Sequence, residues 1–438
     1  MRIRIFLCVL MLGLVMLLTG CNMQTVDKLY CIPKRSEAFN DLQRAIDSAM
    51  SGMAYSAPIS GEHQQSVQLV DITGDGNAEY LVFVKSSGAK PLQILIFAEN
   101  GKDYYLMDTI YCSGYAFEQV EYVRMDRQSG YEIIVCTQVG EQVLRSVSGY
   151  SYKSNRVEQF LSVSCSKFLC YDLDDDGAWE LMTLSPGEND VDCAVAQLFS
   201  YKEGNTERYA EAVTSSSVDS VKRLVVGNLE DGSNAIFVAS SLDERRLVTD
   251  IFALKNGIFV NICKTNHSDT TVETLRNYYV YADDIDDDGI MELPQLFPMD
   301  AGAITQQNQH LICWYSVTSD GQRVDKAFTY HNFVGGWYLE LDIPSIERVS
   351  IAQQGNAYDF YFWDKSFENK DRIFSVYVLV GQDRDEQANA ENRFVIHRAE
   401  SSVYAAKLDF AAATYGITKE KMIRGFHLIL QDWRTGET

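Results

Sequence analysis

A nine-residue acidic motif occurs three times in the chain and constrains its fold more than any other feature. The motif is Asp-x-Asp-x-Asp-Gly-x-x-Glu, with Thr at the third position of the first copy, and the copies begin at Asp71, Asp172 and Asp284. Oxygen-bearing side chains at positions 1, 3 and 5, a Gly at position 6 for a sharp turn, and a carboxylate at position 9 suit a hard cation such as Ca²⁺. The alternative is an acidic surface turn, because Asp and Gly are common turn residues. Three copies with one spacing favour the metal, and the predicted ligands are Asp71, Thr73, Asp75, Glu79, Asp172, Asp174, Asp176, Glu180, Asp284, Asp286, Asp288 and Glu292.

The residues around the motif exclude the EF-hand, the commonest calcium loop. An EF-hand has a bidentate Glu at position 12 and a helix on each side, whereas position 12 here is Val82, Thr183 or Gln295. Short apolar segments flank the loops instead, at 67–70, 79–84, 167–171, 180–184 and 278–281. Short apolar runs bounded by turn residues are typical of strands. Each loop is therefore predicted to join two strands.

The motif belongs to a longer repeat that covers residues 60–332. Loops in equivalent positions begin at 71, 124, 172, 228 and 284. The loop at Arg124 has lost most of its ligands and the loop at Asn228 is shorter, so both are expected to keep the turn without the metal. Four strands are predicted in each repeat, at 66–70, 79–85, 92–98 and 103–110 in the first and at 167–171, 179–184, 193–201 and 206–213 in the third. Four strands in about 50 residues are typical of a β-propeller blade, and a β-sandwich is the alternative.

The loops and the strand that follows each of them resemble the FG-GAP/VCBS repeats of integrin-α-type propellers. More closely, the chain is similar to secreted lipoproteins of Firmicutes that carry such repeats, on the segments 29–33, 55–61, 65–71 and 432–437. The resemblance covers nearly all of the chain after its leader. It implies calcium-binding loops and a propeller, but no activity. Five visible repeats depart from the usual seven blades.

The N-terminal segment has the composition of a secretion signal. Arg2 and Arg4 precede a short apolar run, which is typical of a signal peptide and too short for a favoured transmembrane helix. The sequence that ends at Cys21 resembles the bacterial lipobox, which implies cleavage after residue 20 and lipidation of Cys21. An ordinary signal peptide followed by a structural Cys is the alternative. The expected location is extracytoplasmic, with the chain anchored to the cell membrane through the lipid.

Two further regions complete the predicted domain organisation. Residues 21–59 are interpreted as a tether followed by a helix at 36–53, whose apolar residues recur every three or four positions. A single apolar stripe on a helix normally packs against a core, although binding to a partner is the alternative. Residues 333–438 are interpreted as a separate α+β domain, with strands near 346–351, 358–363 and 372–380 and a final helix after Thr418. The predicted fold is therefore mainly β, a propeller of four-stranded blades with an N-terminal helix and a C-terminal α+β domain.

Charge and cysteine content limit the partners and the compartment. The formal net charge of −23 argues against binding to nucleic acid. Ten cysteines are present, but no Cys-x-x-Cys pair supports a zinc site. The cysteines after Cys21 lie mostly in apolar segments, so buried reduced thiols are favoured over a disulfide framework.

No catalytic motif is apparent in the sequence. The six His show no metal-binding spacing, and neither a nucleophile elbow nor a phosphate-binding loop is present. Aromatic residues at 278–281 and 314–315 can be interpreted as a carbohydrate-stacking surface or, more simply, as core. The preferred hypothesis is a non-enzymatic, calcium-stabilised binding or adhesion-type lipoprotein on the cell envelope, with an unknown protein or glycan ligand. The alternative is an envelope glycan hydrolase or lyase, which an acidic or aromatic cluster at the mouth of the propeller would favour.

Overall fold

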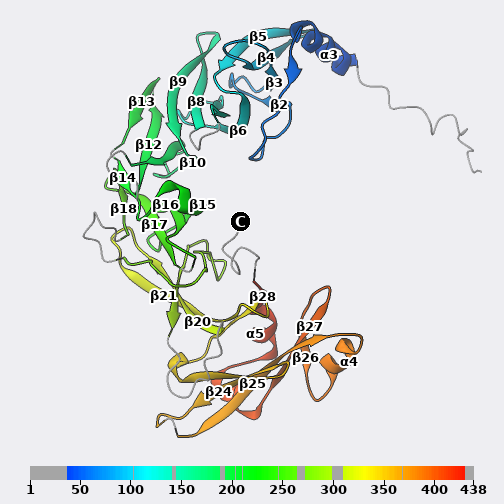
Figure 1. Cartoon of the computed structure of the whole chain (residues 1–438), viewed down its shortest axis with the longest axis vertical. Helices are drawn as coiled ribbons and strands as arrows, with labels where there is room; N and C mark the ends of the chain where they lie inside the picture. Colours follow the sequence, from blue (N-terminus) through cyan, green and yellow to red (C-terminus); the bar gives the residue numbers. More distant parts are fainter. Residues whose placement is uncertain are drawn as a thin grey trace, which may run out of the picture.

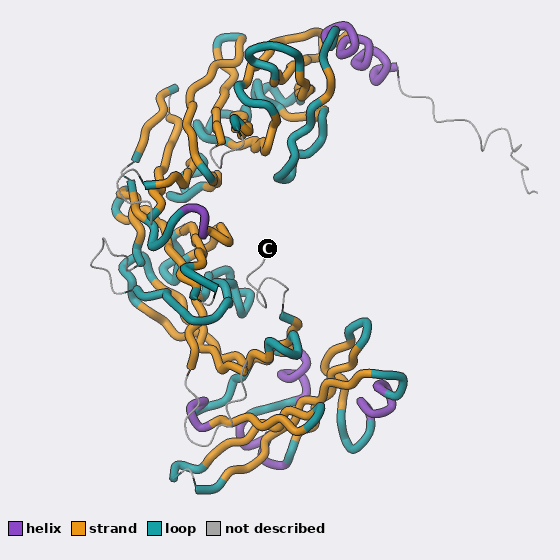
Figure 2. Tube along the Cα trace, viewed as in Figure 1, coloured by secondary structure: helices purple, strands orange, loops and turns teal. Residues whose placement is uncertain are grey.

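The structure is a computed structural model, which describes residues 37–101, 103–140, 145–187, 193–202, 204–209, 211–244, 246–263, 272–297, 309–366 and 368–429. The predicted signal peptide, Cys21, the tether and the tail segment 432–437 lie outside these residues. Strands make up most of the described chain, with a few short helices (Figure 2). Among the described helices, none is both long enough and apolar enough to cross a membrane.

The described strands form six antiparallel sheets. The first sheet contains β1 (Ala54–Tyr55), β2 (Val67–Val70), β3 (Glu79–Lys85), β4 (Leu92–Asn100) and β5 (Asp103–Cys112). The second contains β6 (Ala116–Val123), β7 (Glu132–Gln138), β8 (Arg145–Lys153) and β9 (Arg156–Cys165). The third contains β10 (Lys167–Tyr171), β11 (Glu180–Pro186), β12 (Ala194–Lys202), β13 (Asn205–Arg208) and β14 (Ala212–Val213). These bounds confirm the four strands predicted for the first repeat and the first three of the third repeat, whereas the segment predicted as one strand at 206–213 corresponds to two short strands, β13 and β14.

The remaining sheets continue the series. The fourth contains β15 (Val221–Asn228), β16 (Asn234–Ser241), β17 (Leu247–Lys255) and β18 (Ile258–Asn261), and the 3₁₀ helix η1 (Val218–Ser220) precedes it. The fifth contains β19 (Leu293–Phe297), β20 (Gln309–Val317), β21 (Arg323–Asn332), β22 (Trp337–Glu340) and β28 (Phe426–Leu428). The sixth contains β23 (Val349–Gln354), β24 (Ala357–Trp363), β25 (Lys370–Val380), β26 (Phe394–Arg398) and β27 (Ser402–Leu408). The short helices of this region are η2 (Ile346–Arg348), α4 (Arg384–Asn389), η3 (Phe410–Tyr415) and α5 (Lys419–Arg424).

The sheets follow one another along an open arc (Figure 1). The first strands of the repeats, β2, β6, β10 and β15, lie nearest to the hollow of the arc, and the last strands lie on its outer side. The chain is thus mainly β, with several four- and five-stranded antiparallel sheets. The described residues do not close the arc into a ring.

The hydrophobic core is divided into clusters, most of which join two successive sheets. Residues of the first and second sheets share one cluster, in which the rings of Phe83 and Phe117 meet edge to face at 5.1 Å between centroids. The second and third sheets share the next, where Phe160 stacks on Tyr201 at 3.9 Å. Further clusters join the third sheet to the fourth and the fourth to the fifth. An interior sheet therefore packs on two neighbours, unlike a sheet in a two-layer β-sandwich.

The N-terminal helix α3 (Glu37–Ala49) confirms the predicted helix. Leu42 and Ile46 are buried against Val84 and Phe97 of the first sheet. Burying apolar side chains of this size typically stabilises a fold by about 1.5–3 kcal/mol each. The apolar stripe of this helix therefore packs against a core, which is the interpretation preferred over binding to a partner.

The C-terminal region is joined to the fifth sheet by pairing and by packing. Strand β28 pairs with β22, with Trp337 opposite Leu428, and one core cluster contains Trp337 together with Phe360 and Phe374 of the sixth sheet. The predicted boundary between 332 and 333 falls inside the fifth sheet, between β21 and β22. Independent folding of residues 333–438 stays a prediction.

The segment before the fifth loop differs from expectation. Residues 278–281 do not form a strand, and one of their carbonyls, that of Val280, accepts a hydrogen bond from Nε of the buried Arg276 at 2.7 Å. Tyr278, Val280 and Tyr281 are buried, as are Trp314 and Tyr315. These aromatic residues therefore belong to the core and do not form an exposed surface for stacking on sugars.

The described cysteines support the prediction of buried thiols. All seven described cysteines are buried, namely Cys112, Cys136, Cys165, Cys170, Cys193, Cys263 and Cys313. Burial in an apolar environment raises the pKa of the Cys112 and Cys313 thiols to about 11, which keeps them protonated and unreactive. Cys31 lies outside the described residues.

Candidate metal-binding loops

The three acidic loops share one conformation, which their own side chains fix. Gly76, Gly177 and Gly289 at position 6 have φ of +90°, +84° and +86°, a region that favours glycine. The carboxylate at position 1 then accepts hydrogen bonds from the backbone of the turn. Asp172 accepts from the N–H groups of Asp176 at 3.0 Å and Gly177 at 2.9 Å. Asp284 does the same with Asp288 at 3.0 Å and Gly289 at 2.8 Å.

The Glu at position 9 begins the strand after the loop, or directly precedes it in the case of Glu292, and turns its carboxylate back into the loop. Glu180 accepts a hydrogen bond from the Leu173 N–H at 2.9 Å, and Glu292 accepts one from the Ile285 N–H at 3.1 Å. Their side chains are only 1% and 0% exposed. Two carboxylates, at positions 1 and 9, are thus held on the same side of each loop by the backbone itself.

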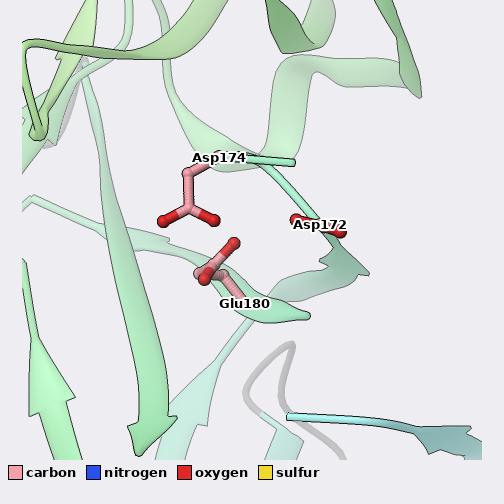
Figure 3. A group of neighbouring side chains, drawn as sticks. All are labelled: Asp172, Asp174 and Glu180. Carbon is pink, nitrogen blue, oxygen red and sulfur yellow. The ribbon is translucent and has the colours of Figure 1, made fainter. Parts of the chain in front are cut away.

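Two of the loops bring three carboxylates together. Asp172, Asp174 and Glu180 each offer an oxygen, and these oxygens all lie within 4.8 Å of one another; Asp284, Asp286 and Glu292 form the same arrangement. Figure 3 shows the carboxylates of Asp174 and Glu180 facing one another, with Asp172 beside them. Each of these two acidic clusters can hold a metal ion.

The buried Glu in each cluster has an oxygen that lacks a partner. Within the described part of the chain, neither Oε1 of Glu180 nor Oε1 of Glu292 makes a hydrogen bond. Leaving a buried polar atom unsatisfied costs about 1–3 kcal/mol, and more for a charged group. Burial, with repulsion from the neighbouring Asp carboxylates, raises the pKa of Glu180 to about 7 and that of Glu292 to about 8. A cation at this position would satisfy the free oxygen and remove the repulsion.

The first loop has a weaker set of ligands because Thr73 stands at position 3. Its hydroxyl lies 3.4 Å from Asp71 Oδ1 and 3.4 Å from Glu79 Oε1, in the place where the other loops have a carboxylate. Asp75 holds the N–H of Asn77 at 2.8 Å and lines a groove of about 800 Å³. This loop does not form a group of three acidic residues among the described residues.

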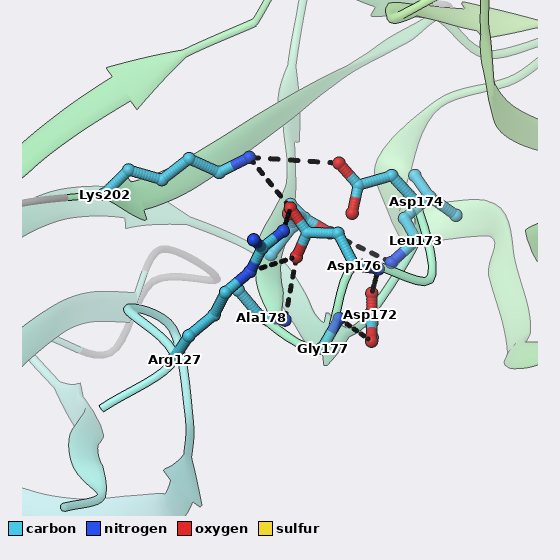
Figure 4. Close-up of polar contacts among 9 residues, drawn as sticks. Arg127, Asp172, Leu173, Asp174, Asp176, Gly177, Ala178 and Lys202 are labelled. Carbon is cyan, nitrogen blue, oxygen red and sulfur yellow. Dashed lines mark hydrogen bonds and ion pairs between the residues drawn. The ribbon is translucent and has the colours of Figure 1, made fainter. Parts of the chain in front are cut away.

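The Asp at position 5 is not part of either three-carboxylate group, because basic side chains hold it. Asp176 accepts from Arg127 Nε at 3.2 Å and from Lys202 Nζ at 3.2 Å (Figure 4). Asp288 accepts from Lys326 Nζ at 3.3 Å. Arg127 belongs to the second loop and Lys202 to the end of β12, so the loop sequence alone carries no sign of these contacts.

The two degraded loops keep the turn and satisfy their acidic groups within the protein. Glu132 accepts hydrogen bonds from the Met125 N–H at 2.8 Å and from the Ser151 hydroxyl at 3.2 Å, so both of its oxygens have partners. In the fourth loop, Glu230 pairs with Lys326 Nζ at 2.7 Å. A hydroxyl or an ammonium therefore satisfies these acidic groups. In the third loop Lys202 Nζ also reaches Asp174, at 3.9 Å, but Oε1 of Glu180 and Oε1 of Glu292 make no hydrogen bond within the described residues.

Backbone hydrogen bonds link successive loops across the sheets. The Tyr131 N–H donates to the Asp71 carbonyl at 3.1 Å, and the Trp179 N–H donates to the Arg124 carbonyl at 2.8 Å. The second loop approaches the first so closely that a Cβ on Gly130 would lie 2.5 Å from the Ile72 carbonyl oxygen. These contacts join the first, second and third loops in series, although the second lacks most of the acidic residues.

Glu132 gives a prediction about pH. Its burial raises its pKa from 4.5 to about 7, so the native state binds more protons than the unfolded state. The stability that the protonated group contributes is complete below about pH 4.5 and is lost as pH rises through about 7. Glu132→Gln should remove this loss, because Gln stays neutral at both pH values and can hydrogen-bond to the Met125 N–H and to the Ser151 hydroxyl. Each pKa unit corresponds to about 1.4 kcal/mol. Urea unfolding at pH 5 and pH 8 should therefore show a gain in stability for the variant over the natural chain at pH 8 only. Equal gains at both pH values would contradict the prediction.

Comparison with known proteins yields only distant similarities. No protein-family profile and no curated protein sequence matches the chain. Among solved structures, an exotype rhamnogalacturonan lyase aligns with 13% identity and a TM-score of 0.29 over 74% of this chain, which spans 65% of the length of the lyase. A rhamnogalacturonan lyase from Bacillus licheniformis aligns with 11% identity and a TM-score of 0.29, over 73% of this chain and 71% of the lyase. A protein from Lactobacillus plantarum aligns with 10% identity and a TM-score of 0.29, over 74% of this chain and 95% of that protein. TM-scores this low support neither a shared fold nor a shared activity.

Proposed function

We propose that the chain is a calcium-stabilised binding protein with a propeller-like scaffold and no catalytic role. The observation that carries the metal proposal is the buried, unpartnered Oε1 atom of Glu180 and of Glu292, each inside a group of three carboxylates. Without a cation, folding would bury in each cluster either an uncompensated charge or a Glu that has to take up a proton. The FG-GAP/VCBS resemblance predicts calcium at the same positions.

Calcium suits the donor set better than the other common divalent ions. All the donors are oxygens, and a loop of this kind supplies them at irregular angles, which Ca²⁺ tolerates. Mg²⁺ needs a nearly ideal octahedron and releases its water reluctantly. Zn²⁺ prefers nitrogen and sulfur ligands, and neither cluster contains a His or a Cys.

The test is a calorimetric titration of Ca²⁺ into chelator-treated protein. Two tight sites are expected, one for each three-carboxylate cluster. A third, weaker site is expected at the first loop, because the neutral hydroxyl of Thr73 replaces a carboxylate. Binding of no calcium at millimolar concentrations would contradict the proposal.

Display on the cell envelope is part of the proposal and depends on Cys21. Measuring how a Cys21→Ser variant divides between the membrane and soluble fractions tests it, since loss of the lipid should release the chain. The alternative of an envelope glycan hydrolase or lyase stays a prediction, because the distant structural alignments give it no support.

A further inference from the structure

A cavity of about 310 Å³ lies where the second, third and fourth sheets meet. Its lining comes from β6, β10 and β15, the strands nearest to the hollow of the arc (Figure 1), together with residues at the facing ends of β7 and β8. The polar residues in the lining include Glu118, Arg145 and Lys167, and the apolar residues include Phe168, Leu169 and Leu224. A cavity of this size is at the lower end of ligand-binding pockets.

Two of the charged groups in the pocket neutralise each other. Arg145 Nη2 lies 2.7 Å from Glu118 Oε1, and the other oxygen of Glu118 accepts from Gln138 Nε2 at 2.8 Å. Arg145 also donates to the Ser166 carbonyl. These contacts fix the guanidinium, and its pairing holds the pKa of Glu118 below the ordinary value despite partial burial. The pair is ionised and rigid.

Lys167 differs because its charge is only partly balanced. The residue is half-buried, and no carboxylate forms an ion pair with it within the described residues. Burial, followed by the positive charges of Arg145 and Lys222, lowers the pKa of Lys167, and Glu118 offsets this only in part. The pocket thus holds two cations, Arg145 and Lys167, and the carboxylate of Glu118, and Lys222 adds positive charge nearby, in a chain whose net charge is −23.

An excess of positive charge in a partly desolvated pocket is unfavourable unless an anion is present. We propose that this pocket binds a small ligand through an oxyanion, a carboxylate or a phosphate, held by Lys167 Nζ beside the fixed Arg145 guanidinium. Phe168, Leu169 and Leu224 provide an apolar wall for the rest of the ligand, which the volume limits to about one sugar-sized ring. Lys222 adds positive charge from β15.

This inference goes beyond the proposed function and does not depend on calcium. Lys167 begins β10 and Asp172 follows its end, so about 16 Å of extended chain separates the pocket from the nearest acidic cluster. A chelator that strips the loops should leave binding of the anion intact.

The experiment is a calorimetric titration of the full chain with glucuronate, glucose 6-phosphate and glucose in low salt. At least one of the two anions should bind, glucose should not, and added salt should weaken binding. Binding of glucuronate alone identifies a carboxylate as the recognised group, and binding of glucose 6-phosphate alone identifies a phosphate. Binding of neither anion, or equal binding of glucose, overturns the inference.

Variants assign the binding to this pocket. Lys167→Gln should weaken anion binding at least tenfold, and Lys167→Arg should retain most of it. Lys90→Gln is the matched control, because Lys90 is exposed, lies outside the pocket and undergoes the same change of charge. Near-UV circular dichroism establishes that each variant is folded. Equal losses in Lys90→Gln and Lys167→Gln, or loss of binding in EDTA, would overturn the assignment.

Discussion

Removing divalent cations with EDTA should lower the melting temperature of the chain, and Ca²⁺ should restore it while Mg²⁺ restores little. A ligand that binds only the native state stabilises it by about 2.7 kcal/mol for each site when its concentration is a hundredfold above Kd. With two three-carboxylate clusters, the combined effect is expected to exceed that of any single substitution discussed here. One kcal/mol shifts the melting temperature of a chain of 150–250 residues by about 2–4 °C, and that of a longer chain by somewhat less.

Differential scanning calorimetry in EDTA, in excess Ca²⁺ and in excess Mg²⁺ measures this effect. Hydrogen bonds donated by the Tyr131 and Trp179 N–H groups join the loops of the first three sheets to one another. Loss of metal should therefore destabilise more than the loop that held it. A melting temperature that is unchanged by the chelator would rule out calcium at both clusters.

Asp174→Asn should have opposite effects with and without calcium. In excess Ca²⁺ the variant loses one charged ligand, so it should bind one ion fewer and lose about 2.7 kcal/mol at a hundredfold excess over Kd. In EDTA the same change should be neutral or slightly stabilising. Burial and the nearby carboxylates of Asp176 and Asp172 raise the pKa of Asp174 in the metal-free protein, which means that its charge is unfavourable there.

The second loop provides the control for this substitution. Asp126 occupies the equivalent third position, and it accepts a hydrogen bond from the Gln128 N–H at 2.9 Å, which Asn can also accept. Asp126→Asn should change neither the number of bound Ca²⁺ ions nor the difference in stability between Ca²⁺ and EDTA. If Asp174→Asn were equally harmful in both conditions, the side chain would be holding a turn and not an ion.

Much of the local structure follows from the sequence because it depends on neighbours along the chain. The strands of the first and third repeats and the helix at 37–49 are set by apolar periodicity and by turn residues. The two acidic clusters are local in the same sense. Positions 1, 3 and 9 come together because the position-1 carboxylate and the position-9 carboxylate both bind backbone N–H groups of their own loop.

Other features depend on residues that are distant in the sequence, and no local pattern encodes them. Asp176 has the residue type and spacing of a ligand, but Arg127 from the neighbouring loop and Lys202 from a neighbouring strand hold it. The segment at 278–281 has the composition of a strand, yet the buried Arg276 takes the Val280 carbonyl. Strand β28 joins β22 across about 90 residues of chain.

The sequence by itself therefore determined the repeated strands, the turn glycines and the acidic residues that each loop gathers, since a few consecutive residues suffice to form them. Only the tertiary structure decided how the sheets succeed one another, which basic side chains reach Asp176 and Asp288, and how Glu118, Arg145 and Lys167 come to share one pocket. Those contacts are made between residues far apart in the sequence, and their energy comes from burial and charge in three dimensions, which periodicity along the chain does not record.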